Sequence, residues 1–312
     1  MFRRPPVADF FKLMIEFAAE FRVREMKEFY REAFRAFRLT DNFWRMVAAM
    51  KRKRVLALTL TLMTVFGLMT WAAGAKDNEA RTAYGKRFAF AGADIKTYLT
   101  QDKNSAPVEL GVEIPASALK NLPATMSDMV LPLPQEAQSL TPFRYLGMEW
   151  NPEGHEPDKI YTMPHFDFHF YIQSLEERNS IDPGACQGVD CADFERAMKA
   201  VPAEYQPRGY KNVGAVVPRM GNHLIDTASP EFNNQPFTRT FLYGAYDGKI
   251  TFYEPMLTLQ YLQSQPNEYL DLKLPAAYAQ TGYYPTRYSV RYDPSKQVYR
   301  ISLERFVYHV AR

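Results

Sequence analysis

The sequence is poor in cysteine and histidine, with two and five of them among 312 residues. Cys186 and Cys191 are spaced as C-x4-C, which is not the C-x-x-C of redox or zinc modules, and neither lies in a recognisable nucleophile motif. The sequence also lacks a G-x-S-x-G elbow, a P-loop and a G-x-G-x-x-G after a strand. Any chemistry must therefore be sought among the histidines.

Positive charge is not in excess over most of the chain. Residues 1–54 carry 14 of the 38 Lys and Arg and 7 of the 35 Asp and Glu, which leaves 24 basic and 28 acidic residues in 55–312. Nucleic-acid binding needs a basic surface that neutralises phosphates. We therefore expect no nucleic acid among the partners.

One long apolar run stands out. Residues 50–75 begin with basic residues, continue as an uncharged apolar stretch and end in small residues at Ala73-Gly74-Ala75, which is the layout of an export signal. Residues 55–75 are also long enough to remain as a membrane anchor. Both alternatives place residues 76–312 outside the cytoplasm, periplasmic or secreted, and the membrane is contacted only through residues 50–75 if they are not cleaved.

Residues 1–49 have the pattern of a basic amphipathic helix, which could lie on the inner membrane face. Their apolar side chains recur at helical spacing: Phe10, Met14, Phe17, Phe21, Met26, Tyr30, Ala33 and Phe37. The alternative is that Met50 is the true start and that residues 1–49 are not translated.

Residues 76–312 have the pattern of strands and turns. Asp247-Gly248 separates two strand-like runs and predicts a two-residue hairpin turn, and residues 293–296 predict a longer one. Short runs rich in β-branched and aromatic residues predict further strands at 87–91, 95–100, 108–114 and 144–150. The expected fold is mainly β, an antiparallel sandwich or distorted barrel with a few short helices.

Helical signals are few, at 116–121, 191–200 and 256–263. Residues 176–218 contain Pro, Gly and Arg and predict a loop that wraps the surface. This loop carries Cys186 and Cys191, which we expect to form a local disulfide in an oxidising compartment.

The stretch PHFDFHFY, residues 164–171, holds two of the five histidines. On a strand, His165, Asp167 and His169 would project from one face and Phe166, Phe168 and Phe170 from the other. The phenylalanine face predicts core packing. The opposite face needs hydrogen-bond partners, water or a metal ion, because buried polar groups are costly when unpaired.

Spacing limits how these side chains could share an ion. Alternate residues on a strand lie about 6.6–6.8 Å apart, which suits two ligands of one metal, whereas His165 and His169 lie about 13 Å apart. The arrangements we expect are one histidine with Asp167 on the ion, or both histidines on it over a bent strand. Asp167 could also orient a ligand from outside the coordination sphere.

Other titratable residues occur in similar turn and strand settings. His155 lies in WNPEGHEP, His223 opens the strand-like run HLID, and Glu254 ends the second arm of the Asp247-Gly248 hairpin. His309, in FVYHV near the end of the sequence, is interpreted as an ordinary strand histidine.

The segments WNPEGHEP, PHFDFHFY, PRMGNH and TFLYGAYDGKITFYEPM together resemble a family of secreted bacterial proteins classed as a domain of unknown function. The resemblance runs from about residue 92 to 262. It implies an exported, oligomeric β domain with His155, His165, His169, His223 and Glu254 at its motif positions. It brings no established reaction.

Two classes of function remain open. The first is a metal-dependent hydrolase that uses one divalent transition metal, Zn, Mn, Co, Ni or Fe, with Asp167 or Glu254 as the base; two-His-one-carboxylate oxygenase chemistry would use the same ligands. The second is a non-catalytic binding or structural domain with a buried His/Asp polar cluster. A ligand position open to solvent favours catalysis, and a closed cluster favours structure.

The sequence therefore predicts an exported, mostly antiparallel β domain with a mononuclear metal site. His165, His169 and His223 are the first expected ligands. Asp167, Glu254 and His155 follow as further ligands or supporting residues.

Overall fold

The computed structural model describes residues 80–182 and 192–312. The predicted N-terminal helix at 1–49, the signal or anchor at 50–75 and the Cys186–Cys191 disulfide lie outside these ranges. None of the helices within them has the length and apolar character needed to cross a bilayer.

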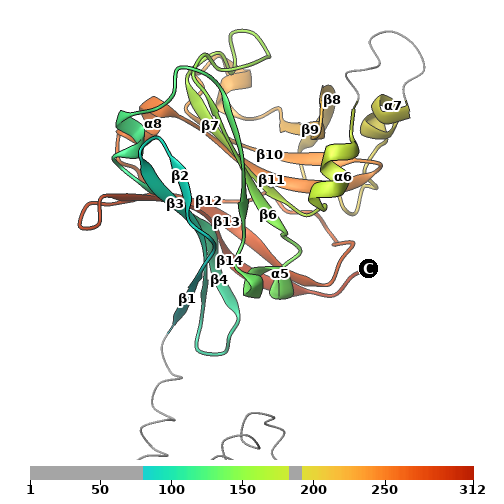
Figure 1. Cartoon of the computed structure of the whole chain (residues 1–312). Helices are drawn as coiled ribbons and strands as arrows, with labels where there is room; N and C mark the ends of the chain where they lie inside the picture. The colour runs from blue at the N-terminus through green and yellow to red at the C-terminus, as the bar shows by residue number, and fades with distance from the viewer. Residues whose placement is uncertain (1–79, 183–191) are drawn as a thin grey trace, which may run out of the picture. The chain divides into compact units, whose positions relative to one another are not determined.

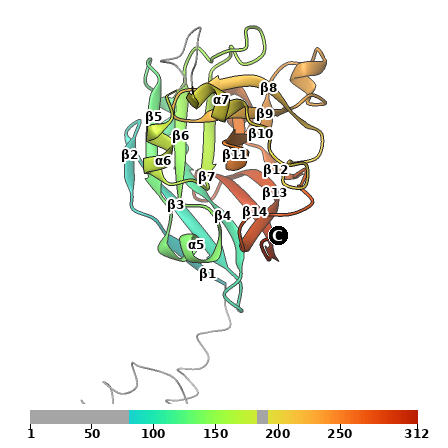
Figure 2. The ribbon, with the colours of Figure 1, turned by 90° about the vertical axis from the view of Figure 1, so that its right-hand side faces the viewer.

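The described residues fold into two antiparallel sheets of seven strands each (Figures 1 and 2). The first sheet has the order β1-β3-β4-β14-β13-β12, with β2 paired to β3. Its strands are β1 (Arg81–Tyr84), β2 (Phe88–Phe90), β3 (Ala93–Gln101), β4 (Pro107–Pro115), β12 (Asn267–Asp271), β13 (Gly282–Asp293) and β14 (Val298–His309).

The second sheet has the order β5-β6-β7-β11-β10-β9-β8, and its strand β7 is formed by residues 165–171 of the PHFDFHFY stretch. Its strands are β5 (Ser127–Pro132), β6 (Tyr145–Asn151), β7 (His165–Tyr171), β8 (Tyr210–Val217), β9 (Gly221–Asp226), β10 (Arg239–Tyr246) and β11 (Lys249–Thr258). The predicted sandwich is confirmed, and the barrel alternative is excluded because the strands form two separate sheets.

Strand alternation places the core between the sheets. Phe166, Phe168 and Phe170 of β7 are fully buried in one apolar cluster with Val112 and Ile301 of the first sheet. Burying each such side chain stabilises the fold by roughly 1.5–3 kcal/mol. The predicted core role of the phenylalanine face is confirmed, so the other face of the second sheet is free to carry polar side chains.

Both predicted hairpin turns are present. Asp247 and Gly248 have φ of +50° and +74° and join β10 to β11, as a two-residue turn with two positive φ angles requires. The chain between Asp293 and Val298 joins β13 to β14.

Helices occupy little of the described chain. They are the α-helices α5 (Gln135–Leu140), α6 (Leu175–Ser180), α7 (Ala192–Met198) and α8 (Leu259–Gln263) and the 3-10 helices η1 (Ala118–Lys120) and η3 (Pro230–Asn233). The helix expected at 116–121 is only one 3-10 turn. The helix expected from 256 begins at Leu259, because β11 continues to Thr258 and the Thr258 side chain caps the helix.

The helix predicted at 191–200 is confirmed as α7, but the predicted surface loop at 176–218 is wrong in part, because α6 and strand β8 also lie within or across it. Ser174 and Glu177 form a capping box that starts α6, a sequence signal that was overlooked. Strand β8 lies at the sheet edge and is interrupted by a bulge near Gly214, so its sequence lacks a clear alternation.

Candidate metal centre

Strand β7 presents His165, Asp167 and His169 on the face opposite the phenylalanines, and all three are buried. Three other predicted residues join them: His155 from the loop between β6 and β7, His223 from β9 and Glu254 from β11. The structure divides the six sequence-predicted residues into two groups. The Asp167 cluster is His155, His165 and Asp167; the Glu254 cluster is His169, His223 and Glu254.

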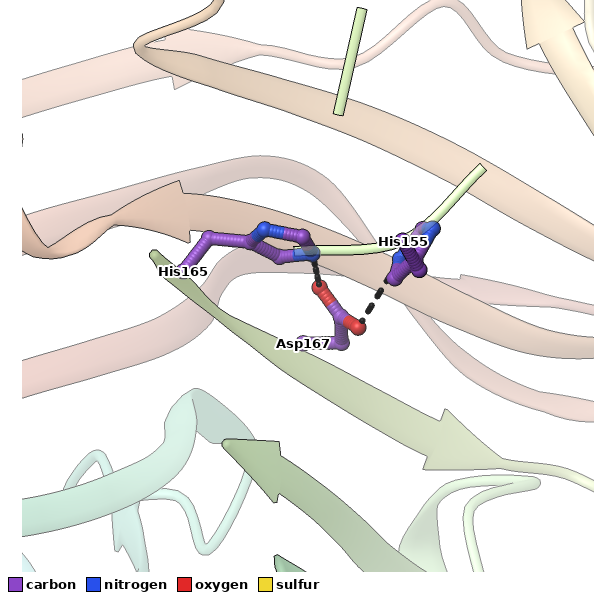
Figure 3. A group of neighbouring side chains, drawn as sticks. All are labelled: His155, His165 and Asp167. Atoms are coloured by element: carbon purple, nitrogen blue, oxygen red, sulfur yellow. Dashed lines mark ion pairs between the residues drawn. The ribbon is translucent and has the colours of Figure 1, made fainter. Parts of the chain in front are cut away.

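In the Asp167 cluster one carboxylate lies between two imidazoles (Figure 3). His165 Nε2 is 3.1 Å from Asp167 Oδ1, and His155 Nε2 is 3.3 Å from Oδ2. Asn151 of β6 donates its side-chain amide to Oδ2 at 2.7 Å. The carboxylate is thus fixed from three sides.

His155 reaches this position through a tight turn. Gly154 has φ of +72°, and a Cβ there would overlap the carbonyl oxygen of Tyr161. His155 N donates to that same oxygen at 3.0 Å, and its ring packs edge-on against the Tyr161 and His165 rings. The turn-rich WNPEGHEP segment therefore delivers its histidine to the sheet.

In the Glu254 cluster the carboxylate comes from β11. The register pairs on either side, Tyr253 with Phe170 and Met256 with Asp167, place Glu254 across from His169. His169 Nε2 is 3.1 Å from Glu254 Oε1, and His223 Nε2 is 3.7 Å from Oε2. This cluster is almost wholly buried.

Three of the four clustered histidines are held in the same way. His155 Nδ1 lies 2.6 Å from the Glu156 carbonyl oxygen, His165 Nδ1 lies 2.6 Å from that of Met163, and His223 Nδ1 lies 3.1 Å from that of Ala215. A carbonyl only accepts, so each Nδ1 carries its hydrogen and each ring turns its Nε2 toward a carboxylate. Metal-binding histidines characteristically donate their other N–H to a carbonyl in this way.

Several of the converging atoms have no hydrogen-bond partner among the described residues: His165 Nε2, Asp167 Oδ1, both ring nitrogens of His169, and Glu254 Oε2. Two facing lone pairs repel unless a cation, either a proton or a metal ion, lies between them. Unpartnered buried polar atoms are uncommon in proteins. Their concentration here fits the donor set of a metal ion, and both clusters could hold one.

The electrostatics of the clusters are dominated by the two carboxylates. Burial alone would raise the pKa of Asp167, but His165 and His155 hold it well below its usual range. Burial lowers the pKa of His155 and His169, yet Asp167 and Glu254 outweigh it and raise each pKa to about 9. For His223, burial wins over Glu254 and lowers the pKa, so this imidazole is neutral and ready to bind a metal near pH 7.

All the clustered residues except His165 line one cavity of about 520 Å³. The His155 side chain, 40% exposed, lies at its edge, whereas those of His165 and His169 are at most 2% exposed. A cavity of this volume is in the range of small-molecule sites. The clusters therefore adjoin a cavity, as catalysis or ligand binding would require.

Glu149 of β6 was missed in the sequence. It pairs in register with Asp167, is 7% exposed and lines the same cavity. Burial raises its pKa to about 7, with His169 opposing the rise and Asp167 adding to it. A single carboxylate in the apolar run YLGMEW, on the strand before PHFDFHFY, was the available signal.

A larger cavity of about 860 Å³ shares no residue with the histidine cavity. Its walls include Tyr246, Tyr253 and Tyr284, and its Arg196 and Lys199 are paired with Asp247. His309 belongs to neither cluster and packs against the Tyr278 ring at a tilt, as expected of an ordinary strand histidine. The clustered titratable groups thus concentrate in the smaller cavity.

Comparisons with known proteins bear on a short part of the chain. A family model described as TTHB210-like (hypothetical protein TTHB210) matches residues 102–150. This segment contains none of the five histidines. Searches of the curated proteins and of the solved structures gave no significant match.

Proposed function

We propose that the protein is an exported metal-binding β domain that carries one divalent transition-metal ion in each cluster and hydrolyses a substrate in the cavity beside them. The observation that supports this most strongly is the common arrangement of His155, His165 and His223. Each gives its Nδ1 hydrogen to a backbone carbonyl and turns Nε2 toward a buried carboxylate. The single site expected from the sequence is replaced by two, because His165 and His169 point into different clusters.

The donor set limits which metal ions could bind. Two imidazoles and one carboxylate suit Zn²⁺, Mn²⁺, Co²⁺, Ni²⁺ or Fe²⁺ rather than Ca²⁺ or Mg²⁺. Three protein ligands leave coordination positions free, as in catalytic rather than structural zinc sites. A bound ion there supplies Lewis acidity and lowers the pKa of water.

Among the chain's own groups, Glu149 is suited to move a proton. Its pKa of about 7 lies near neutral pH, where a general acid–base group is most effective. Asp167 and Glu254, first considered as bases, lie within the clusters and are better assigned as ligands. We therefore assign proton transfer to Glu149, and positioning of the Asp167 carboxylate to Asn151.

Oxygenase chemistry uses the same two-His-one-carboxylate set with Fe²⁺. The protonatable Glu149 favours hydrolysis, because hydrolysis needs a proton acceptor and no redox change. A non-catalytic polar cluster is the remaining alternative. The open cavity argues against it, since a purely structural network gains nothing from an adjacent cavity.

Export is part of the proposal and is supported by residues 50–75 alone. Protease is added to cells whose outer barrier is permeabilised but whose inner membrane is intact. A domain outside the cytoplasm would be cut, whereas a cytoplasmic domain would be protected. Sequencing the first residue of the isolated protein distinguishes cleavage after Ala75 from retention of an anchor.

Elemental analysis of the full chain, purified without a His tag, tests whether a metal is bound and which one. Hydrolysis of ester, lactone and phosphate substrates is then measured with each added ion, in the wild type and in Glu149→Gln. Activity with redox-inactive Zn²⁺ that falls in Glu149→Gln supports the hydrolase. Bound metal without turnover of any substrate class leaves the non-catalytic binding domain as the better description.

A further inference from the structure

The cavity beside the clusters is apolar over much of its wall. On the floor, Met256 lies next to Asp167 in register, and Leu242 lies next to Glu254. Further apolar lining comes from β8, β9 and the segments that follow them, and from Met126 just before β5: Met126, Val213, Val217, Pro218, Met220, Ile225 and Phe232. The cavity therefore combines a substantial apolar wall with the clustered ionisable groups and with further charged residues, Asp128, Arg178 and Arg219.

The two carboxylates on β6 and β7 lie apart from much of the apolar lining, whereas Glu254 of β11 and His223 of β9 lie beside it. Glu149 and Asp167 lie on β6 and β7, where PHFDFHFY runs, while Leu242 and Ile225 lie on β10 and β9. Met256 and Leu242 also belong to an apolar cluster with Ile225, Phe237 and Tyr161. A ligand lying across the sheet would meet the clustered carboxylates and imidazoles and, directly beside them, a packed hydrocarbon surface.

The apolar surface continues outward to solvent. Met126, Val213 and Val217 line the cavity and are 60%, 54% and 37% exposed. Exposed apolar side chains that adjoin a concave site mark binding surfaces more often than scattered single ones do. Val213 lies in the bulge of the edge strand β8, where it has no register partner on β9.

We infer that the substrate is an amphiphile, a carboxylic ester or lactone with an alkyl or acyl chain. The reacting carbonyl would lie over the Asp167 and Glu254 clusters, and the chain would lie along Met256, Leu242 and the β8 wall. This inference rests on the proposed hydrolase for the reaction, but the chain-binding wall is an independent feature. A small polar substrate would leave this wall unused, and a protein partner would not need the cavity.

The test separates binding of the ligand's alkyl chain from hydrolysis. Affinities of the linear carboxylates from butanoate to decanoate are measured by calorimetry on the full chain in detergent-free buffer, both EDTA-treated and loaded with Zn²⁺. Each added methylene is expected to raise the affinity about fourfold until the cavity is filled. The same dependence on acyl length is expected in kcat/KM for p-nitrophenyl esters.

Two variants probe the wall. Val213→Asp/Val217→Asp is expected to reduce the gain per methylene to less than twofold, with metal content unchanged. Val307→Asp/Val310→Asp is the matched control, because these valines are 44% and 65% exposed and line neither cavity. Met126→Gln, outside the strands, provides a second wall variant, and melting temperatures show that each variant folds.

The outcomes distinguish the two proposals. Affinity that is independent of chain length in the wild type overturns the amphiphile, whether or not metal binds. A length dependence lost equally in the Val307/Val310 control also overturns it. A length dependence that persists without metal, together with no ester hydrolysis under any ion, leaves the apolar binding wall standing and removes the hydrolase.

Discussion

His165 and His169 lie on the same face of β7, four residues apart, yet their imidazoles serve different carboxylates. His165 Nε2 is 3.1 Å from Asp167, and His169 Nε2 is 3.1 Å from Glu254. A strand rises about 3.3 Å per residue, so these two side chains are too far apart to converge readily on one ion. The extended backbone itself therefore separates the two candidate metal sites.

This separation predicts independent loss of metal. His165→Ala is expected to remove the ion of the Asp167 cluster and His223→Ala that of the Glu254 cluster, so each variant retains about one of two equivalents. The double variant should retain none. Elemental analysis after gel filtration measures the content.

His309→Ala is the matched control, since His309 belongs to neither cluster. Metal content equal to wild type in the double variant would show that the clusters are not metal sites. A complete loss in either single variant would show instead that all six residues hold one centre.

The fold was largely predictable because its signals are local. The alternation in PHFDFHFY determines which side chains face the core, and Asp247-Gly248 determines the hairpin that brings Glu254 of β11 beside β7. The strand spacing also indicated that His165 and His169 would not easily share an ion. These inferences needed only the chain's own geometry.

The division of the ligands was not predictable, because it depends on register between distant strands. Glu254 is placed across from His169 by the β7–β11 pairing, and His223 is brought in by the β9–β10 pairing. Glu149 was missed for the same reason: its neighbour Asp167 is on the next strand. A single sequence contains no direct record of these pairings.

The raised pKa of Glu149 predicts a pH-dependent stability in EDTA-treated protein. Its folded pKa of about 7 exceeds the ordinary 4.5, so its contribution is fully present below pH 4.5 and is lost as pH rises through 7. The loss is about 3 kcal/mol by the usual conversion. Urea unfolding at several pH values, for the wild type and Glu149→Gln, measures it.

The difference between the two proteins is the quantity to examine, because other groups titrate in both. As pH rises from 4.5 to 7.5, the unfolding free energy of Glu149→Gln should increase relative to that of the wild type. A difference that stays constant with pH would mean that Glu149 is not held in this environment.

Metal binding is expected to release protons. His155 and His169 have pKa values raised to about 9 by their carboxylates, so both are protonated at pH 7 without metal. Because metal ligands must be deprotonated, filling both clusters should release about two protons per chain. Calorimetric titration with Zn²⁺ in buffers of different ionisation enthalpy counts them.

The count should fall toward zero as the titration is repeated above pH 9, where both imidazoles are already neutral. His169→Ala should release about one proton fewer than the wild type at pH 7. A binding heat that does not depend on the buffer at pH 7 would contradict the assignment of these histidines as ligands.

The turn at Gly154 offers a way to disturb one cluster without touching a ligand. In Gly154→Ala the new Cβ overlaps the Tyr161 carbonyl oxygen, which also accepts from His155 N, so the turn must shift and carry His155 away from Asp167. Gly92→Ala is the control: its φ of +76° gives similar backbone strain, about 1–2 kcal/mol, but its Cβ has no heavy atom closer than 3.8 Å.

We expect Gly154→Ala alone to lower Zn²⁺ affinity at the Asp167 cluster by at least tenfold and to leave the Glu254 cluster unchanged, because His169, His223 and Glu254 are held by β7, β9 and β11 rather than by this turn. Two-site calorimetry resolves the two affinities, and equal weakening of both would mean that the clusters act as one unit.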